Sequence, residues 1–205
     1  MERVRCMDPE PGYPQAERAR ASGGGFQRVG GLVEVPGLLR ELGCSPEPVL
    51  SRAGVDPAVL GTADHRISYA AATTLLHECA AATGRHDFGL LAGQRWRLAH
   101  LGTLGAVMKS APTVGEALQL LATYQHRNSD VGAAFVLQQD EFASLGYVVY
   151  RQGVPHLAYA YDVAMAFACN ILRELAGPRW RATEVLLSRY SRRMRDRIVS
   201  TTARR

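Results

Sequence analysis

A run of five consecutive residues, Tyr124-Gln125-His126-Arg127-Asn128, concentrates polar and aromatic side chains in one short stretch. A guanidinium is a bidentate partner for a carboxylate, and histidine and side-chain amides supply hydrogen-bond donors and acceptors. Such residues at a junction between a helix and a strand can line a cavity for a small molecule. We therefore expect Tyr124, His126 and Arg127 to contact a carboxylate or another polar small molecule. In the alternative interpretation, Tyr124 packs while His126 and Arg127 face solvent.

Two further candidates stand near the start of a long expected helix. His156 and Tyr159 lie three positions apart, the spacing that brings side chains onto one helical face. We expect this pair to face the same space as the cluster around Arg127. The sequence alone does not identify the ligand.

Residue patterns for catalysis or metal binding are missing from the sequence. His77 and Cys79 are two positions apart on an expected helix, so they point to different faces and cannot share a metal ion. His86 and Asp87 are interpreted as a solvated turn. There is no G-x-S-x-G elbow, no phosphate-binding glycine loop and no Cys-x-x-Cys pair. We expect no enzymatic activity, no metal and no cofactor.

The elements that must position these residues follow from apolar periodicity and capping signals. Ser68 is a suitable N-cap, and Thr113 and Glu116 have the spacing of a capping box. Apolar residues at helical spacing predict helices at about residues 35–42, 49–53, 69–83, 98–109, 113–122 and 156–176. Residues 88–93 are expected to form a short, closely packed turn or helix.

The period changes to that of strands in the second half of the chain. Residues 131–137 and 142–150 are rich in β-branched and aromatic residues and flank the polar turn 138–141, which predicts a β-hairpin. Residues 184–187 predict one further strand that could join the same sheet. The expected fold class is α+β, mostly helical with a small antiparallel sheet formed by the hairpin and this strand.

Composition is that of an ordinary soluble globular protein. Hydrophobic residues make up 47% and charged residues 21% of the 205 residues. No apolar run approaches the ~18 residues that would span a bilayer, and no signal peptide is evident. The four cysteines form no disulfide framework of a secreted protein. We expect a cytoplasmic protein with no membrane partner.

Three regions differ in composition. Residues 1–30 are rich in proline and glycine and are expected to be disordered. Residues 31–188 are expected to form one domain, and residues 189–205 a basic tail that is disordered or a product of truncation. From residue 179 onward there are nine arginines against two acidic residues, whereas the preceding residues hold fifteen basic and seventeen acidic ones. We interpret the tail as an incidental charged end; the alternative is non-specific phosphate binding.

The order of three segments carries a family resemblance over residues 32–188. The segments begin at Leu38, Arg66 and Leu101 and read LLRELGCSPEPVLSRAGVDPAVL, RISYAAATTLLHECAAATGRHDFGLLAG and LGTLGAVMKSAPTVGEALQLLATYQHR. Together with the hairpin, the long helix and the stretch Trp180–Leu187, they resemble the N-terminal "arabinose-binding" effector and dimerisation domain of AraC/XylS-type transcription regulators. The family pattern is expected to stop after Leu187, where the arginines begin.

The resemblance implies a ligand-sensing and dimerisation domain. In that family two helix-turn-helix units follow, and nothing in this chain corresponds to them, so we expect a chain truncated before its DNA-binding domain, through a frameshift or an early stop. The expected partners are a small-molecule effector and a second subunit, in a homodimer or in a heterodimer with a full-length regulator. DNA would be bound only through the missing domain. The rival functions are a stand-alone small-molecule binding module and a small enzyme.

Overall fold

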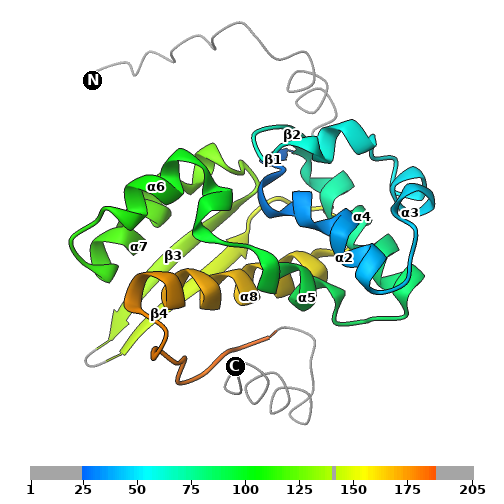
Figure 1. The fold of residues 1–205 in the computed structure, drawn as a ribbon. Coiled ribbons are helices and arrows are strands. Elements are labelled where there is room, and N and C mark those ends of the chain that lie inside the picture. Colours follow the sequence, from blue (N-terminus) through cyan, green and yellow to red (C-terminus); the bar gives the residue numbers. More distant parts are fainter. Residues whose placement is uncertain (1–24, 140–141, 188–205) are drawn as a thin grey trace, which may run out of the picture.

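The computed structural model describes residues 25–139 and 142–187. These residues form a mostly helical α+β fold with two small antiparallel sheets, so the expected fold class is confirmed (Figure 1). The α-helices are α2 (Val35–Glu41), α3 (Pro46–Arg52), α4 (Tyr69–Thr83), α5 (Phe88–Arg95), α6 (Thr103–Lys109), α7 (Val114–Tyr124) and α8 (Leu157–Ala176). The 3-10 helices are η1 (Gly30–Glu34), η2 (Pro57–Gly61), η3 (Leu98–Leu101) and η4 (Gln125–Arg127). The strands are β1 (Phe26–Arg28), β2 (Arg66–Ser68), β3 (Gly132–Gln139) and β4 (Phe142–Val149).

The elements form two groups that α8 joins. Helices α2 to α5 gather beside the β1–β2 sheet, whereas α6 and α7 pack beside the β3–β4 hairpin (Figure 1). Helix α8 contacts α4 and α5 in the first group and α7 and β4 in the second. Each group has its own apolar core, and Trp96 packs against both cores. The space between the two groups is therefore bounded by α8 on one side and by Trp96 at the junction.

Helix α4 forms as its sequence predicts. The Ser68 hydroxyl accepts a hydrogen bond from the Ala71 amide at 3.1 Å, and Gly84 ends the helix in the left-handed conformation at φ 65°. The expected inward face is confirmed as buried: Ala72, Leu75, Leu76, Cys79 and Ala80. This face holds α4 rigidly beside the space between the two groups.

Helix α7 begins at the predicted capping residue. Thr113 Oγ1 accepts a hydrogen bond from the Glu116 amide at 3.1 Å, which is one of the two bonds of a capping box. Ala117, Leu118 and Leu121 on its inner face are buried in the second core. The chain then leaves α7 directly into η4, so the segment Gln125 to Asn128 turns back toward β1.

The helix expected over residues 98–109 is two helices. Gly102 interrupts it with φ 62°, a left-handed conformation that favours glycine, so η3 ends there and α6 starts in a new direction. A Cβ atom on Gly105 would lie within 1.9 Å of the Leu98 carbonyl oxygen, so α6 rests directly on η3. The Gly102 and Gly105 spacing therefore reflects a chain reversal as well as close packing.

Two expectations at the ends of the domain are wrong. Residues 184–187 have no regular secondary structure; Leu187 is instead buried against Leu90. The second sheet forms at the other end, where β1 pairs with β2 in the register Phe26↔Ser68. Residues 25–30 were expected to be disordered, yet Phe26 and Val29 are buried in the fold. Residues 1–24 and 188–205, which include the expected tail, lie outside the described residues.

Helices α5 and α8 pack at very close range. A Cβ atom on Gly93 would lie 2.5 Å from the Val163 carbonyl oxygen and 2.8 Å from Ala166 Cβ. Gly89 similarly faces the backbone of Tyr159 at 2.8 Å. The short segment at residues 88–93 is thus a helix whose glycines permit the close packing that the sequence indicates. None of the helices described here has the length and apolar character needed to cross a membrane.

Candidate functional site

A cavity of about 130 Å³ lies between the two groups of elements. Its walls come from β1, α4, the loop around Trp96, the Gln125–Ser129 turn, the hairpin and α8. Its larger apolar residues are Leu32, Leu76, Trp96, Leu101, Leu121, Leu145, Met165, Phe167 and Ile171. Its polar residues are Gln27, Arg28, Tyr69, Thr73, His100, Gln125, Asn128, Ser129 and Tyr147. The cavity is therefore an apolar space with a limited polar wall, which is the usual chemistry of a small-molecule site.

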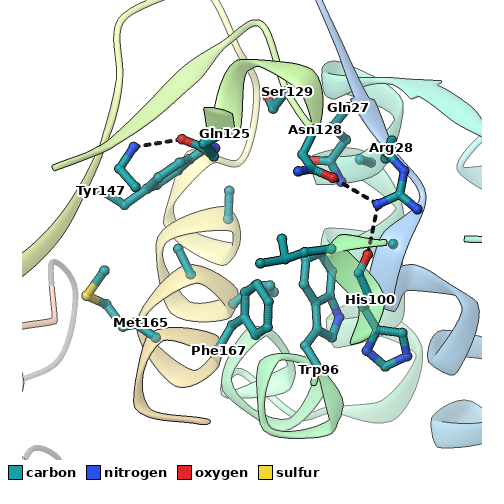
Figure 2. Close-up of a pocket in the computed structure, with 18 of the residues that line it drawn as sticks. Gln27, Arg28, Trp96, His100, Gln125, Asn128, Ser129, Tyr147, Met165 and Phe167 are labelled. Atoms are coloured by element: carbon teal, nitrogen blue, oxygen red, sulfur yellow. Dashed lines mark hydrogen bonds between the residues drawn. The ribbon is translucent and has the colours of Figure 1, made fainter. Parts of the chain in front are cut away.

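The polar residues are not spread evenly around the cavity. Figure 2 shows Gln27, Arg28, Asn128 and Ser129 on one side and Met165 and Phe167 on the opposite side. The polar side derives from β1 and the turn after η4, which the isolated bridge between Gln27 and Ser129 holds together. A ligand here would meet hydrogen-bonding groups at one end and hydrocarbon at the other.

Arg28 is the charged group of the polar side, and its side chain is only 13% exposed. Nη1 donates to Asn128 Oδ1 at 2.8 Å and to the His100 carbonyl oxygen at 2.9 Å, and Nη2 donates to Asp64 Oδ1 (Figure 2). The Asp64 side chain is 84% exposed, so water screens its charge far more than that of Arg28. These bonds fix the guanidinium and orient the Asn128 amide.

The apolar side is built around an aromatic pair. Trp96 and Phe167 meet edge to face with their ring centroids 5.3 Å apart, a favourable geometry for two aromatic rings. A Cβ atom on Gly31 would lie 2.2 Å from the Trp96 ring, so only glycine leaves room for the indole there. The tryptophan is thus held between η1 and α8 at the junction of the two cores.

Two tyrosines close the cavity next to the hairpin. Tyr69 Oη and Tyr147 Oη lie 3.2 Å apart and share a hydrogen bond. Burial raises the pKa of both phenols above their usual value, so both stay neutral at physiological pH. Gln125 Oε1 accepts a hydrogen bond from the Ala134 amide at 2.7 Å, which ties the turn to β3.

His100 contributes a neutral ring. Burial lowers its pKa, and this outweighs the carboxylate of Glu34, whose Oε1 lies 3.6 Å from His100 Nε2. Nδ1 accepts a hydrogen bond from the Arg97 amide at 2.9 Å, so the ring proton of the neutral form is on Nε2. Because His100 is neutral, Arg28 is the charged residue among the described residues that line the cavity.

Two buried donors beside the cavity have no hydrogen-bond partner among the described residues. They are Trp96 Nε1 and Asn128 Nδ2. Buried donors are nearly always satisfied in folded proteins, so an unpaired one calls for an explanation such as a water molecule or a ligand. Both residues line the same cavity.

None of the five residues that the sequence singled out for ligand binding lines this cavity. Tyr124 is 42% exposed, and His126 and Arg127 are exposed as well. His156 stacks on His77 with ring centroids 3.8 Å apart, and Tyr159 lies 5.8 Å from the same His77 ring. The structure therefore divides the five into two separate places, and their role in ligand binding stays a prediction.

The segment around Arg127 nevertheless contributes to the cavity through its other members. Gln125 and Asn128, which flank His126 and Arg127, both face it. Their orientation follows from η4 and its C-cap, because Gln125 and the C-cap residue Asn128 are three positions apart and lie on one face. Arg28 was missed because it lies in the segment expected to be disordered, and no local signal pairs it with Asn128.

No group of three or more His, Cys, Asp or Glu residues in the described part of the chain is placed to hold a metal ion. Cys44, Cys79 and Cys169 are free thiols. Burial raises the pKa of the Cys79 thiol to about 12, so it is not a thiolate nucleophile at neutral pH.

A mostly helical α+β body around such a cavity defines a ligand-binding type of domain. Residues 43–199 match the model of the arabinose-binding domain found at the N-terminus of AraC transcription regulators, and the chain belongs to this family. The match continues to residue 199, so the expectation that family character stops after Leu187 is wrong.

Comparison with curated proteins finds transcription regulators. The chain is 30% identical over 147 residues to the HTH-type transcriptional regulator VirS of Mycobacterium tuberculosis, a stretch that covers 71% of this chain and 43% of that protein. It is 31% identical over 87 residues to the ornithine utilization regulator of Pseudomonas aeruginosa, covering 42% of this chain and 26% of that protein. The chain thus matches less than half the length of these relatives.

Proposed function

We propose that this chain is the ligand-sensing and dimerisation domain of an AraC-type transcription regulator, and that the cavity beside Trp96 and Asn128 is its effector site. Two observations support the proposal. The chain belongs to a family of regulator N-terminal domains. The cavity that it encloses places two buried, unpaired donors beside an apolar space. The unpaired donors carry the argument: they belong to two residues of the cavity wall, and an acceptor on a ligand that displaces the atoms covering them would satisfy them.

The position of the cavity suggests how occupancy is sensed. Leu32 and Leu76 belong to the first apolar core, and Leu121 and Ile171 to the second, yet all four line the cavity. A bound molecule would therefore contact both groups of elements at once. A ligand that fits one relative arrangement of the groups better than another shifts the population toward it.

The test fills the cavity from the side of α8. Ala168 lines the cavity, whereas Ala106 on α6 is exposed and does not. We expect compounds from a small-molecule screen to raise the melting temperature of wild type and of Ala106→Phe but not of Ala168→Phe. Equal stabilisation of Ala168→Phe by the same compounds would overturn the effector site.

We propose that the chain dimerises through the outer face of the β3–β4 hairpin. Exposed large apolar side chains lie on one face of the hairpin, at odd positions of β3 and even positions of β4: Phe135, Leu137, Phe142 and Val148. Tyr150, directly after β4, is exposed as well. An apolar patch of this kind on a regulator domain fits a second copy of the chain, which would present the same face in a two-fold interface. A heterodimer with a full-length regulator would use the same patch.

The remaining predictions need the gene and the full regulator. Truncation before a DNA-binding domain stays a prediction, which the nucleotide sequence downstream of codon 205 tests. The rival, a binding module without a role in transcription, is favoured if that sequence and its neighbours encode no helix-turn-helix pair. The prediction of no enzymatic activity rests on the absence of a catalytic pattern in the sequence.

A further inference from the structure

We infer that the cavity is selective for a compact apolar carboxylate, bound with its carboxylate at Asn128 and Arg28 and its hydrocarbon body against Trp96 and Phe167. This inference rests on the proposed effector site and names its ligand class. It follows from the size of the cavity, from the hydrogen-bonding groups left unused in its wall and from the sign of the charge there.

Size limits the ligand to about one ring. The cavity measures about 130 Å³. An apolar cavity of roughly 150 Å³ in a protein interior holds a benzene molecule. The enclosed part of the cavity therefore accommodates about one six-membered ring, and a substituent must extend along the polar wall or toward the open side.

Three of the acceptors on the polar wall are already occupied. Asn128 Oδ1 accepts from Arg28, Gln125 Oε1 accepts from the Ala134 amide, and His100 Nδ1 accepts from the Arg97 amide. The unpaired groups are instead donors, Asn128 Nδ2 and Trp96 Nε1. Because Asn128 Oδ1 accepts the hydrogen bond from Arg28, the group of this amide that remains unpaired is its NH2 donor. A ligand that pairs with these donors must therefore carry a hydrogen-bond acceptor.

The charge of the wall selects an anionic acceptor. No Asp or Glu is among the described residues that line the cavity, and Arg28 is the lining residue with a permanent charge. Its ion-pair partner Asp64 lies outside the lining set and is 84% exposed, so the charged group that faces the cavity is the Arg28 guanidinium. Hydrogen bonds from such a donor set are strengthened when the acceptor is ionised.

The opposite wall accepts hydrocarbon. Phe167 and Trp96 present ring surface, and Ala164 and Ala168 on successive turns of α8 leave room beside them. A sugar such as arabinose would place some of its hydroxyl groups against these aromatic rings, where they lose water without gaining a hydrogen-bond partner. An amine would bring a positive charge next to Arg28. Both classes are therefore disfavoured by the same residues that favour the carboxylate.

Three probes of the same shape test the class. They are cyclohexanecarboxylate, cyclohexanecarboxamide and cyclohexylmethylamine, titrated into the full chain by calorimetry, with arabinose as a fourth. We expect the carboxylate to bind at least tenfold more tightly than the amide, and the amine and arabinose to show no measurable binding. A carboxylate that binds no more tightly than the amide overturns the inference.

One substitution reverses the selectivity without changing the size of the side chain. Asn128→Asp keeps an oxygen acceptor for Arg28 but replaces the free amide donor with a second acceptor. We expect this variant to lose at least tenfold in affinity for the carboxylate while its affinity for the amide changes less. The matched control is Arg40→Gln, which removes the charge of an exposed arginine on α2 that does not line the cavity and should leave carboxylate binding unchanged. Unchanged carboxylate binding by Asn128→Asp overturns the inference.

The outcomes separate the ligand class from the effector site itself. If all four probes fail on wild type but another compound binds wild type and not Ala168→Phe, the effector site stands and the carboxylate class is overturned. If the carboxylate binds Ala168→Phe as tightly as wild type, the cavity is not its site, and the proposed effector site falls with the inference.

Discussion

Arg28 Nη1 donates a hydrogen bond to Asn128 Oδ1 at 2.8 Å across 100 residues of sequence. The same nitrogen reaches the His100 carbonyl oxygen at 2.9 Å, so one guanidinium ties β1 to two other segments of the cavity wall. Lysine can supply only a single ammonium at this place and cannot match the planar fork. The cavity wall therefore depends on an arginine at position 28.

We expect Arg28→Lys to lower the free energy of unfolding by about 1–3 kcal/mol, the usual cost of losing hydrogen bonds at a partly buried polar group. Urea denaturation measures this. Arg127→Lys, on an exposed arginine of the same turn, should change stability by less than ~0.5 kcal/mol. If the urea denaturation curves of Arg28→Lys and wild type have the same midpoint and slope, the hydrogen bonds of Arg28 make no net contribution to the free energy of unfolding.

The helix pair α5–α8 gives a second prediction on stability. Gly93→Ala places a Cβ atom 2.5 Å from the Val163 carbonyl oxygen. Helix α5 is packed into the first core and α8 into both, so separating the two helices would disturb that packing. We expect a loss of about 1–3 kcal/mol, as for other overpacked sites. Gly115→Ala is the matched control, because its new Cβ would meet only Thr113 Oγ1 at 3.9 Å. This control should be neutral or gain up to ~1 kcal/mol from helix propensity.

A third prediction concerns His156 at the start of α8, which stacks on His77 of α4. Burial, and then the charge of His77, lower the pKa of His156, while Glu78 acts in the opposite direction. The unfolded chain therefore binds more protons than the folded one just below the ordinary histidine pKa of 6.5, and stability falls as the pH falls through that range. His100, whose pKa is also lowered by burial, contributes in the same direction.

The variant His156→Asn tests this dependence. Asparagine suits the left-handed backbone at this position, where φ is 53°, so the start of α8 should be retained. We expect the melting temperature of the variant to fall less steeply than that of wild type between about pH 7 and pH 5.5. Parallel curves for the two proteins would remove His156 from the explanation.

The fourth prediction tests the hairpin as a dimer surface. Leu137 is 54% exposed on the outer face of β3, and Val107 on α6 is 48% exposed elsewhere. If the hairpin face binds a second copy, Leu137→Glu should weaken self-association at least tenfold in sedimentation equilibrium, because it places a charge in an apolar contact. Val107→Glu should associate like wild type. A wild-type chain that stays monomeric at high concentration contradicts the proposed interface.

Much of the fold could be predicted because its signals are local. Ser68 and Thr113 cap the helices that follow them within three residues, and Gly84 ends α4 directly after the last apolar turn. The hairpin followed from two runs of β-branched and aromatic residues on either side of a polar turn. These features depend on neighbours in the chain, so a single sequence is enough to show them.

The errors arose where distant residues decide the structure. Residues 184–187 have strand propensity but no partner strand, and Leu187 packs against Leu90 instead. β1 forms because β2 pairs with it, although its own segment is short and follows a glycine run. The cavity combines Arg28, Trp96 and Asn128, whose proximity comes from tertiary packing, so only part of its wall was visible around Gln125 and Asn128.

The two tryptophans of the chain offer a direct measurement of the cavity as the effector site. Trp96 lines the cavity and has an unpaired indole N–H, whereas Trp180 lies outside it. In proton–nitrogen correlation spectra, a compound that stabilises the protein should shift the indole N–H resonance of Trp96 and leave that of Trp180 unchanged. If such a compound shifts the Trp180 resonance alone, or neither resonance, the ligand binds elsewhere and the cavity is not the sensor.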